Sequence, residues 1–330
     1  MDELFVPSRY LTLASAVAAA ATALLVACAP RLRWGDAPTA SERARKLQDH
    51  PVPTVGGAAL AIAVAVAAWA WGCETYYPFD EVLWGAPVGY AALGLAFLAG
   101  FLDDVLPGGL RVAPKLALQG LAALPLGWAV LADRGLFEAA AIFPLRTGAL
   151  LAALAIVFLA LLAMNAINFF DNSDGAAGGL SALTFCVASP LVGWALLGFL
   201  PFNLKRRTPR APFAYLGDSG SHLLGMWFVL HIAAWPALCL PVCDSVQVCL
   251  SRWREGAPLW RADRLHLAHR LERAGVSRGA IVAVLLLVAA PSVVVGWRAV
   301  GAGDWGTAAV GMGATAVGYL GALWYAGGRS

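Results

Sequence analysis

The sequence predicts an all-α protein, a polytopic integral membrane helical bundle of about 10–11 transmembrane helices. Of its 330 residues, 60% are hydrophobic and 13% are charged, whereas soluble domains contain about 45–50% apolar and about 25% charged residues. The apolar residues also gather in runs of about 20, the length that a helix needs to cross a hydrocarbon core about 30 Å thick. These observations exclude a soluble domain, and we treat residues 1–330 as a single integral membrane domain.

Seven apolar runs are long enough to span a membrane. They lie at about 10–30, 54–73, 84–102, 113–132, 147–167, 279–299 and 305–326. The region 176–250 is also apolar but interrupted, so its helices are harder to delimit. The first run has an alternative interpretation as a cleaved export signal, because Leu25-Val26-Ala27-Cys28 resembles a lipoprotein cleavage box, although the chain begins with acidic rather than basic residues.

Basic residues in the loops predict the orientation, because Lys and Arg are retained on the cytoplasmic side. We place the segment after the first run and the segment 252–278 in the cytoplasm. The loop 74–83 carries three acids and no basic residue, which fits the outer side and places the N-terminus outside as well. The basic residues that carry this argument are Arg31, Arg33, Arg43, Arg45, Lys46, Arg252, Arg254, Arg261, Arg264, Arg270, Arg273 and Arg278.

The charge balance bears on the partners. Twenty-three Lys and Arg against 20 Asp and Glu leave a formal charge of +3, too little for a nucleic-acid partner, which requires a concentrated basic face. The sequence also contains no Walker-type glycine loop, so ATP-driven transport has no support.

Acidic residues gather in three motifs that should all face the cytoplasm. Asp103 and Asp104 close the run 84–102, the segment 165–175 follows the run 147–167, and Asp218 precedes a further apolar stretch. Charged residues at the ends of membrane helices are functional candidates, because burying them is costly. Helix capping could explain one such motif, but three motifs on one side, opposite a loop with Arg261, Arg264, His266 and His269, favour a shared site.

Clustered carboxylates repel one another unless a cation lies among them, and oxygen ligands favour a hard ion such as Mg²⁺, with Mn²⁺ as an alternative. Mg²⁺ in turn prefers phosphate oxygens as further ligands, and Arg side chains in the nearby loop could bind the same phosphates. The residues therefore predict metal-assisted phosphoryl chemistry at the cytoplasmic membrane surface.

Several motifs, in order, resemble the polyprenyl-phosphate N-acetylhexosamine-1-phosphate transferase family, of the glycosyltransferase family 4 type. The resemblance covers roughly residues 40–280. It is closest to the undecaprenyl-phosphate sugar-1-phosphate transferase branch, which is related to phospho-N-acetylmuramoyl-pentapeptide transferase. The motifs are His50-Pro-Val-Pro53-Thr-Val-Gly56-Gly57, Phe101-Leu-Asp103-Asp104 with Lys115 and Gln119 downstream, Asn165-Ala-Ile-Asn168-Phe-Phe-Asp171-Asn-Ser-Asp174-Gly175, Phe202-Asn203, Gly217-Asp218-Ser-Gly220-Ser221 and Asp263-Arg264-Leu-His266-Leu-Ala-His269.

The resemblance implies one transferase domain that moves a sugar 1-phosphate from a UDP-sugar, a UDP-N-acetylhexosamine by expectation, to undecaprenyl phosphate. It implies release of UMP at the cytoplasmic face of the inner membrane, as the first step of a cell-envelope glycan such as lipopolysaccharide or cell wall. The implied partners are the UDP-sugar, undecaprenyl phosphate and membrane lipid; a homodimer stays open. A degenerate member that binds these ligands without turnover is the alternative.

The resemblance also assigns residues position by position. Asp218 resembles the Mg²⁺ ligand, and Asp103, Asp104, His266 and His269 resemble the catalytic groups. Lys115 could equally be a lysine that reaches toward the membrane interface. The residues expected to bind substrate are Lys115, Asn168, Asp171, Asp174, Arg261 and Arg264.

One interval is short. The family places two spanning helices between its Asn-x-x-Asp segment and its Phe-Asn, but Asp174 and Asn203 are only about 29 positions apart, which allows two helices of about 20 Å each. We favour a short hairpin that breaks at Ser189-Pro190 over the loss of one crossing, because a single crossing would place the basic residues 205–210 and Asp218 outside. With a second turn near Trp235-Pro236, this gives eleven membrane segments and a C-terminus inside.

Overall fold

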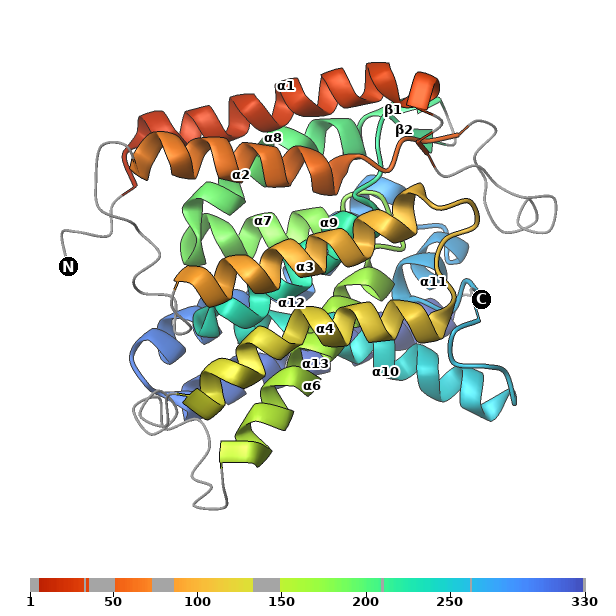
Figure 1. Ribbon diagram of the computed structural model, residues 1–330. Coiled ribbons are helices and arrows are strands. Elements are labelled where there is room, and N and C mark those ends of the chain that lie inside the picture. The colour runs from red at the N-terminus through yellow and green to blue at the C-terminus, as the bar shows by residue number, and fades with distance from the viewer. Residues whose placement is uncertain are drawn as a thin grey trace.

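Helices dominate the computed structural model (Figure 1), which describes residues 6–32, 34–35, 51–72, 86–132, 149–208, 211–261 and 263–328. The helices are α1 (Ser8–Leu32), α2 (Gly56–Gly72), α3 (Ala86–Val105), α4 (Val112–Ala132), α6 (Ala149–Phe170), α7 (Ala176–Ala188), α8 (Pro190–Leu204), α9 (Gly217–Leu230), the 3-10 helix η1 (Ile232–Leu238), α10 (Cys239–Arg254), α11 (Leu267–Arg273), α12 (Arg278–Gly301) and α13 (Trp305–Gly327). The all-α prediction is confirmed, and each predicted apolar run coincides with one helix to within a few residues.

The predicted membrane character is also confirmed. Seven helical stretches in the described ranges are long and apolar enough to cross a bilayer: α1, α3, α4, α6, η1 with α10, α12 and α13. Helices α2, α7 and α8 are apolar but shorter. Large apolar side chains such as Trp324, Leu287 and Trp69 lie exposed on the outside of the bundle, which suits a lipid surface rather than water.

The short middle helices form the predicted hairpin. Helix α7 ends at Ala188 and α8 begins at Pro190, with Ser189 between them in a non-helical conformation. Proline is favoured in the first turn of a helix and disfavours a helical residue before it, which explains why the break falls there. The second predicted turn, near Trp235-Pro236, is η1, which joins α9 to α10. Together with the longer helices, the described ranges then hold eleven helices of 13 residues or more outside η1 and α11.

Helix α9 is the centre of the bundle. It packs against α2, α3 and α6 and continues into η1, and every residue from Ser219 to Leu230 is buried. A helix that is buried on all sides lies in a core rather than at a surface. Around it, α1 packs on α2 and α8, α4 packs on α3 and α6, and α12 pairs with α13.

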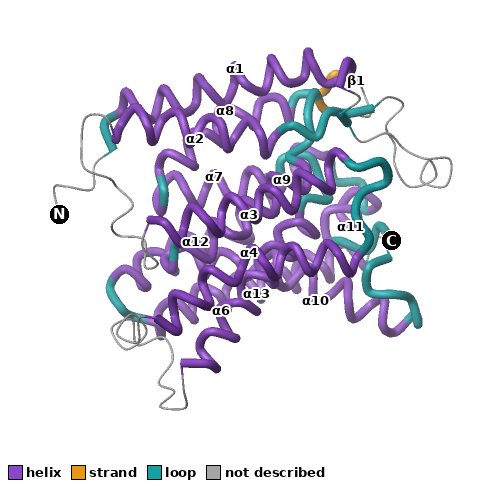
Figure 2. Tube along the Cα trace, viewed as in Figure 1, coloured by secondary structure: helices purple, strands orange, loops and turns teal. Residues whose placement is uncertain are grey.

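The longer described loops gather at one end of the bundle, on the right in Figure 2, whereas short turns such as the one between α12 and α13 lie at the other end. That end holds the α3–α4 turn, the start of α9, helix α11 and a short antiparallel ribbon of β1 (Arg206–Thr208) and β2 (Ala211–Pro212). The sequence analysis did not predict this ribbon. All three acidic motifs lie at this same end, as the charge argument requires for a shared site.

Candidate active site

The N-terminus of α9 carries Asp218 and is held in place by close backbone contacts. The segment before α2 pairs with the segment before α9: Tyr215 N donates to Pro53 O (2.8 Å), and Gly57 N donates to Leu216 O (2.9 Å). A Cβ atom on Gly57 would overlap the backbone of Gly220. Gly57 is therefore a position of close backbone packing, whereas His50 of the same motif lies outside the described residues.

The carboxylate of Asp104 caps α9. One of its oxygens accepts from Asp218 N (2.9 Å), and the other accepts from Ser219 N (2.9 Å) and Ser219 Oγ (2.6 Å). These are backbone donors that a helix start leaves unpaired, and an anion there also interacts favourably with the helix dipole. Asp104, which lies on α3, thus holds the start of the neighbouring helix α9 in place.

Asp218 lies between two polar side chains from other helices. Lys115 Nζ, at the start of α4, forms an ion pair with one carboxylate oxygen of Asp218. Asn168 Nδ2, near the end of α6, donates to the other oxygen (2.8 Å) and also reaches Ser221 Oγ (3.0 Å). Three helices that are distant in sequence therefore converge on one carboxylate.

Asp103 lies on the other side of the same lysine. Its Oδ2 is 3.5 Å from Lys115 Nζ, and its Oδ1 accepts from Leu110 N (2.8 Å) in the α3–α4 turn. Lys115 therefore bridges Asp103 and Asp218. This contact argues against the interfacial alternative, because an interfacial lysine would extend toward the headgroups rather than pair with two acids. The role of Lys115 in substrate binding stays a prediction.

The Asp171–Asp174 loop follows α6 and is anchored by buried Asn203. Asn203 Oδ1 accepts from Gly175 N (2.7 Å), and its Nδ2 donates to Ala214 O (3.0 Å), so one side chain joins this loop to the segment before α9. Burial, and then the carboxylates of Asp174, Asp218 and Asp104, raise the pKa of Asp171 well above its usual value. The acids of the three motifs are thus close enough to repel one another.

The donor set fits Mg²⁺. In the described ranges, no group of three or more His, Cys, Asp and Glu side chains is arranged as a ready-made metal cage. Mg²⁺ does not need one, because it is often held by one or two carboxylates and completes its coordination with phosphate oxygens and water. Asp218, with Asp103 beside it, supplies this minimal set, and a positive ion there would relieve the repulsion among the acids.

The loop before α11 brings His266 to the end of α6. The rings of Phe169 and His266 lie edge to face with centroids 6.0 Å apart, and Phe169 follows Asn168, which binds Asp218. Arg252, only 3% exposed, lies over the same Phe169 ring (5.3 Å) and pairs with Asp263 (2.7 Å). The basic loop, which we define as residues 252–278, therefore contacts the end of α6, which carries Asn168.

The other predicted basic groups differ in their placement. His269 lies beside His266, with ring centroids 6.4 Å apart. Burial, and then the positive charge of Arg264, lower the pKa of His269 to about 4, so its ring is neutral near pH 7. Arg264 pairs with Glu272 (2.6 Å) and adds positive charge beside His269, whereas Arg261 is 56% exposed and lies 3.8 Å from Glu255.

Sequence reasoning missed two polar groups in this region, Asp244 and His222. Asp244 on α10 binds His266, and His222 on α9 contacts Gln119, which also binds Asn165 in a buried chain. Asp244 lies within an apolar helix, and an isolated acid there was a usable signal. The contact itself was not predictable, because Asp244 and His266 belong to different elements.

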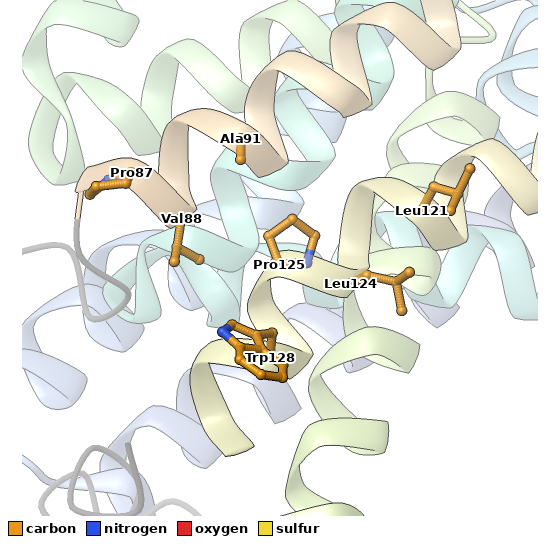
Figure 3. A pocket seen from close by; sticks show the side chains of 7 residues that line it. All are labelled: Pro87, Val88, Ala91, Leu121, Leu124, Pro125 and Trp128. Atoms are coloured by element: carbon orange, nitrogen blue, oxygen red, sulfur yellow. The ribbon is translucent and has the colours of Figure 1, made fainter. Parts of the chain in front are cut away.

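A shallow apolar groove of about 420 Å³ lies elsewhere, between α3 and α4. Figure 3 shows its seven lining residues, which are Pro87, Val88, Ala91, Leu121, Leu124, Pro125 and Trp128. Ala91 and Asp103 are twelve positions apart on α3, which corresponds to about 18 Å along the helix. The groove therefore belongs to the opposite end of these helices and adds no polar group to the site.

Comparison with known proteins gives the class. The sequence model of glycosyl transferase family 4 matches residues 87–235, the stretch from α3 to η1 that holds Asp103, Lys115 and Asp218. An undecaprenyl-phosphate alpha-N-acetylglucosaminyl 1-phosphate transferase of Escherichia coli K12 is 26% identical over 276 residues, which cover 74% of this chain and 72% of the relative. A decaprenyl-phosphate N-acetylglucosaminephosphotransferase of Mycolicibacterium smegmatis is 27% identical, with coverage of 86% and 80%.

The described fold is that of a multi-pass membrane protein, and residues 87–235 are similar to the family 4 glycosyl transferases. The resemblance to the polyprenyl-phosphate N-acetylhexosamine-1-phosphate transferases, predicted from the motifs, is confirmed.

Proposed function

We propose that the protein is a Mg²⁺-dependent phosphoglycosyl transferase that moves a sugar 1-phosphate from a UDP-sugar to undecaprenyl phosphate. In this reaction, an oxygen of the lipid phosphate attacks the phosphorus that carries the sugar. The bond from that phosphorus to the bridging oxygen of the diphosphate breaks, and UMP leaves with the oxygen. The product is a lipid-diphosphate-sugar, the starting unit of a cell-envelope glycan.

One observation carries the proposal: Asp218 is held by Lys115 and Asn168 beside Asp103, at the end of the bundle where the basic loop also lies. Two phosphate-bearing substrates bring several negative charges together, and such chemistry depends mainly on positioning and charge neutralisation. Mg²⁺ held by Asp218 would supply part of that neutralisation when bound. The loop charges favour the cytoplasmic side of the inner membrane for this end.

The two adjacent acids then have different tasks. Asp104 already accepts three hydrogen bonds from the start of α9, so its task is to hold Asp218 in place. Asp103 accepts one backbone hydrogen bond and faces Lys115, so it has spare capacity to accept a proton from the lipid phosphate or to orient that group. Lys115 limits the repulsion between Asp103, Asp218 and the incoming phosphates.

His266 lies beside Phe169, the residue that follows Asn168, and His269 lies beside His266. Together with Arg264, these side chains are suited to bind the diphosphate of the nucleotide sugar. Because His269 is neutral near pH 7, it acts there as a hydrogen-bonding group, while Arg264 provides fixed charge. The exposed Arg261 contributes only through its longer-range charge.

The test uses purified protein in detergent or nanodiscs, a panel of radiolabelled UDP-sugars and undecaprenyl phosphate. We expect one or more sugars to enter a lipid product with release of UMP, and EDTA to stop the reaction until Mg²⁺ is restored. Asp218→Asn keeps the size of the side chain but removes the anion, and should lower turnover at least about a hundredfold.

Asp304→Asn is the matched control. Asp304 caps the first turn of α13 by accepting from Thr307 N (2.9 Å), and it lies outside the proposed site. The same chemical change there should leave transfer within about twofold of wild type. Binding of UDP-sugar without transfer of any sugar would overturn the enzyme proposal in favour of a degenerate binding protein.

A further inference from the structure

Asp244 is a buried acid in the middle of helix α10, and it is only 1% exposed. An acidic side chain in an apolar helix is costly unless other groups satisfy it. Here one oxygen lies 2.7 Å from Nδ1 of His266, and the other accepts from Leu267 N (2.9 Å) and faces the Tyr319 hydroxyl (3.3 Å). Asp244 therefore joins α10 to the start of α11 and to α13.

This contact determines the state of the His266 ring. An ionised carboxylate can only accept hydrogen bonds, so Nδ1 of His266 must carry the hydrogen in this contact. Nε2 is then the nitrogen that is left to interact with a ligand. The hydrogen bond to Leu267 N fixes the backbone beside the ring, so the position and the tautomer of His266 are set by the same side chain.

The ring that Asp244 holds lies next to the end of α6, which carries part of the proposed site. His266 is 6% exposed and contacts the edge of Phe169, which follows the Asp218 partner Asn168. An unprotonated Nε2 and a phosphate oxygen are both hydrogen-bond acceptors. His266 can therefore bind a phosphate oxygen through Nε2 only when Nε2 carries a proton. A nearby carboxylate stabilises the doubly protonated imidazolium that such a contact needs.

We propose that Asp244 is a positioning residue that orients His266 and stabilises its imidazolium form when the diphosphate of the nucleotide sugar binds. The inference rests on the proposed transferase function. Tyr319 supports it by contacting the second oxygen of Asp244 from α13. Asp244 touches no substrate and acts only through His266.

Other charged and titratable groups surround His266. Asp263 lies in the preceding loop, His269 lies on α11, and Tyr319 reaches the pair from α13. Arg252 on α10 and Arg264 in the loop supply positive charge next to Asp263 and His269 respectively. Helix α6 contributes the uncharged Phe169. Each of these groups is unchanged when only Asp244 is replaced. A change in the pH dependence of transfer or in the nitrogen NMR signal of His266 therefore reports on Asp244.

The central experiment is a double-mutant cycle on transfer. Asp244→Asn should lower kcat about tenfold or more in the wild-type background while changing the KM for UDP-sugar less than about threefold. In a His266→Ala background, the same substitution should change kcat less than about twofold, because the residue through which Asp244 acts is already gone. Equal effects of Asp244→Asn in both backgrounds would show a purely structural role and overturn the proposal.

The pH profile provides a second readout. If Asp244 acts through His266, Asp244→Asn should change the pH dependence of transfer in the wild-type background but not in the His266→Ala background. Asp304→Asn, which lies outside the proposed site, is the control and should leave the profile in place. An unchanged profile in a folded Asp244→Asn protein would contradict the proposal.

A third readout does not depend on activity. Nitrogen NMR of labelled histidine should find the hydrogen of His266 on Nδ1 in the wild type, with His266→Ala used to assign the signal, and should find it redistributed in Asp244→Asn. If the wild type transfers no sugar but this result holds, the transferase proposal fails while the positioning of His266 by Asp244 stands. A wild-type signal with hydrogen only on Nε2 would overturn the positioning.

Discussion

Asp103 and Asp104 are adjacent in sequence, yet their carboxylates have different surroundings. Asp104 points to the start of α9 and accepts three hydrogen bonds there. Asp103 points to the α3–α4 turn and to Lys115. An Asp-Asp pair in a sequence suggests one shared function, but consecutive side chains on a helix are about 100° apart and meet different neighbours.

This difference predicts different effects on stability. Asp104→Asn places an amide nitrogen where an acceptor is needed, and leaves part of the α9 start unpaired, at a cost of about 1–3 kcal/mol. Asp103→Asn affects one backbone hydrogen bond and one partly exposed ion pair, so its cost should be smaller. Thermal unfolding in detergent should give a lower Tm for Asp104→Asn than for Asp103→Asn. Equal Tm values would refute the capping role.

The sequence predicted which residues gather at the site better than it predicted their contacts. Acids at three helix ends were expected to share a face, and Lys115, Asn168 and Asp218 do converge. The motifs said nothing of Asp244, because its partner His266 follows 22 positions later in another element. A local pattern records helix ends and charge, whereas a pairing across elements depends on how the helices pack.

At the scale of elements, glycines let three helices approach one another closely. Gly57 on α2 and Gly100 on α3 both face the start of α9, and a Cβ on Gly100 would overlap the backbone of Asp218. Small residues allow such close contact between membrane helices. The position of Asp218 therefore depends on the absence of a methyl group on α3.

Gly100→Ala should displace the start of α9 and lower both stability and transfer. Forcing an extra carbon into a packed contact costs about 1–3 kcal/mol. Gly94→Ala, on the same helix, is the matched control, because a Cβ there has nothing within 4 Å. Tm and single-turnover transfer should both fall for Gly100→Ala and stay near wild type for Gly94→Ala. The opposite order, or equal loss in both variants, would contradict the contact of Gly100 with the start of α9 as the cause, because helix propensity alone favours alanine over glycine at both positions.

The middle helices show what chain spacing can and cannot predict. The short interval after Asp174 and the proline at Pro190 predicted the α7–α8 hairpin, because proline restricts the residue before it. The same reasoning gave no sign of the β1–β2 ribbon, which has only three and two residues. Such a ribbon depends on its neighbours rather than on its own alternation pattern.

At the scale of the molecule, the order of the helices predicts the side of each turn. With the N-terminus outside and eleven crossings, the loop after α10 lies inside and the α12–α13 turn lies outside. Glu255 and Ala302 are exposed residues in these two places. The excess of arginine around the first of them agrees with retention on the cytoplasmic side.

Cysteine labelling of intact cells should show this arrangement. In a variant without the six native cysteines, Ala302→Cys should react with a membrane-impermeant maleimide, whereas Glu255→Cys should react only after the cells are permeabilised. Retained transfer activity would show that the variants are correctly inserted. Reaction of Glu255→Cys in intact cells would place the proposed site outside and contradict the topology.

The packing of α1 on α8 has a consequence for how the protein is made. Gly198 on α8 lies so close to Ser15 on α1 that an added Cβ would overlap the carbonyl oxygen of Ser15. Helix α8 begins 158 positions after α1 ends, which corresponds to about 8–30 s of synthesis at ordinary translation rates. Helix α1 is therefore synthesised well before α8, one of the two helices on which it packs, and the face that α8 covers is exposed during that interval to quality-control proteases and to other nascent helices.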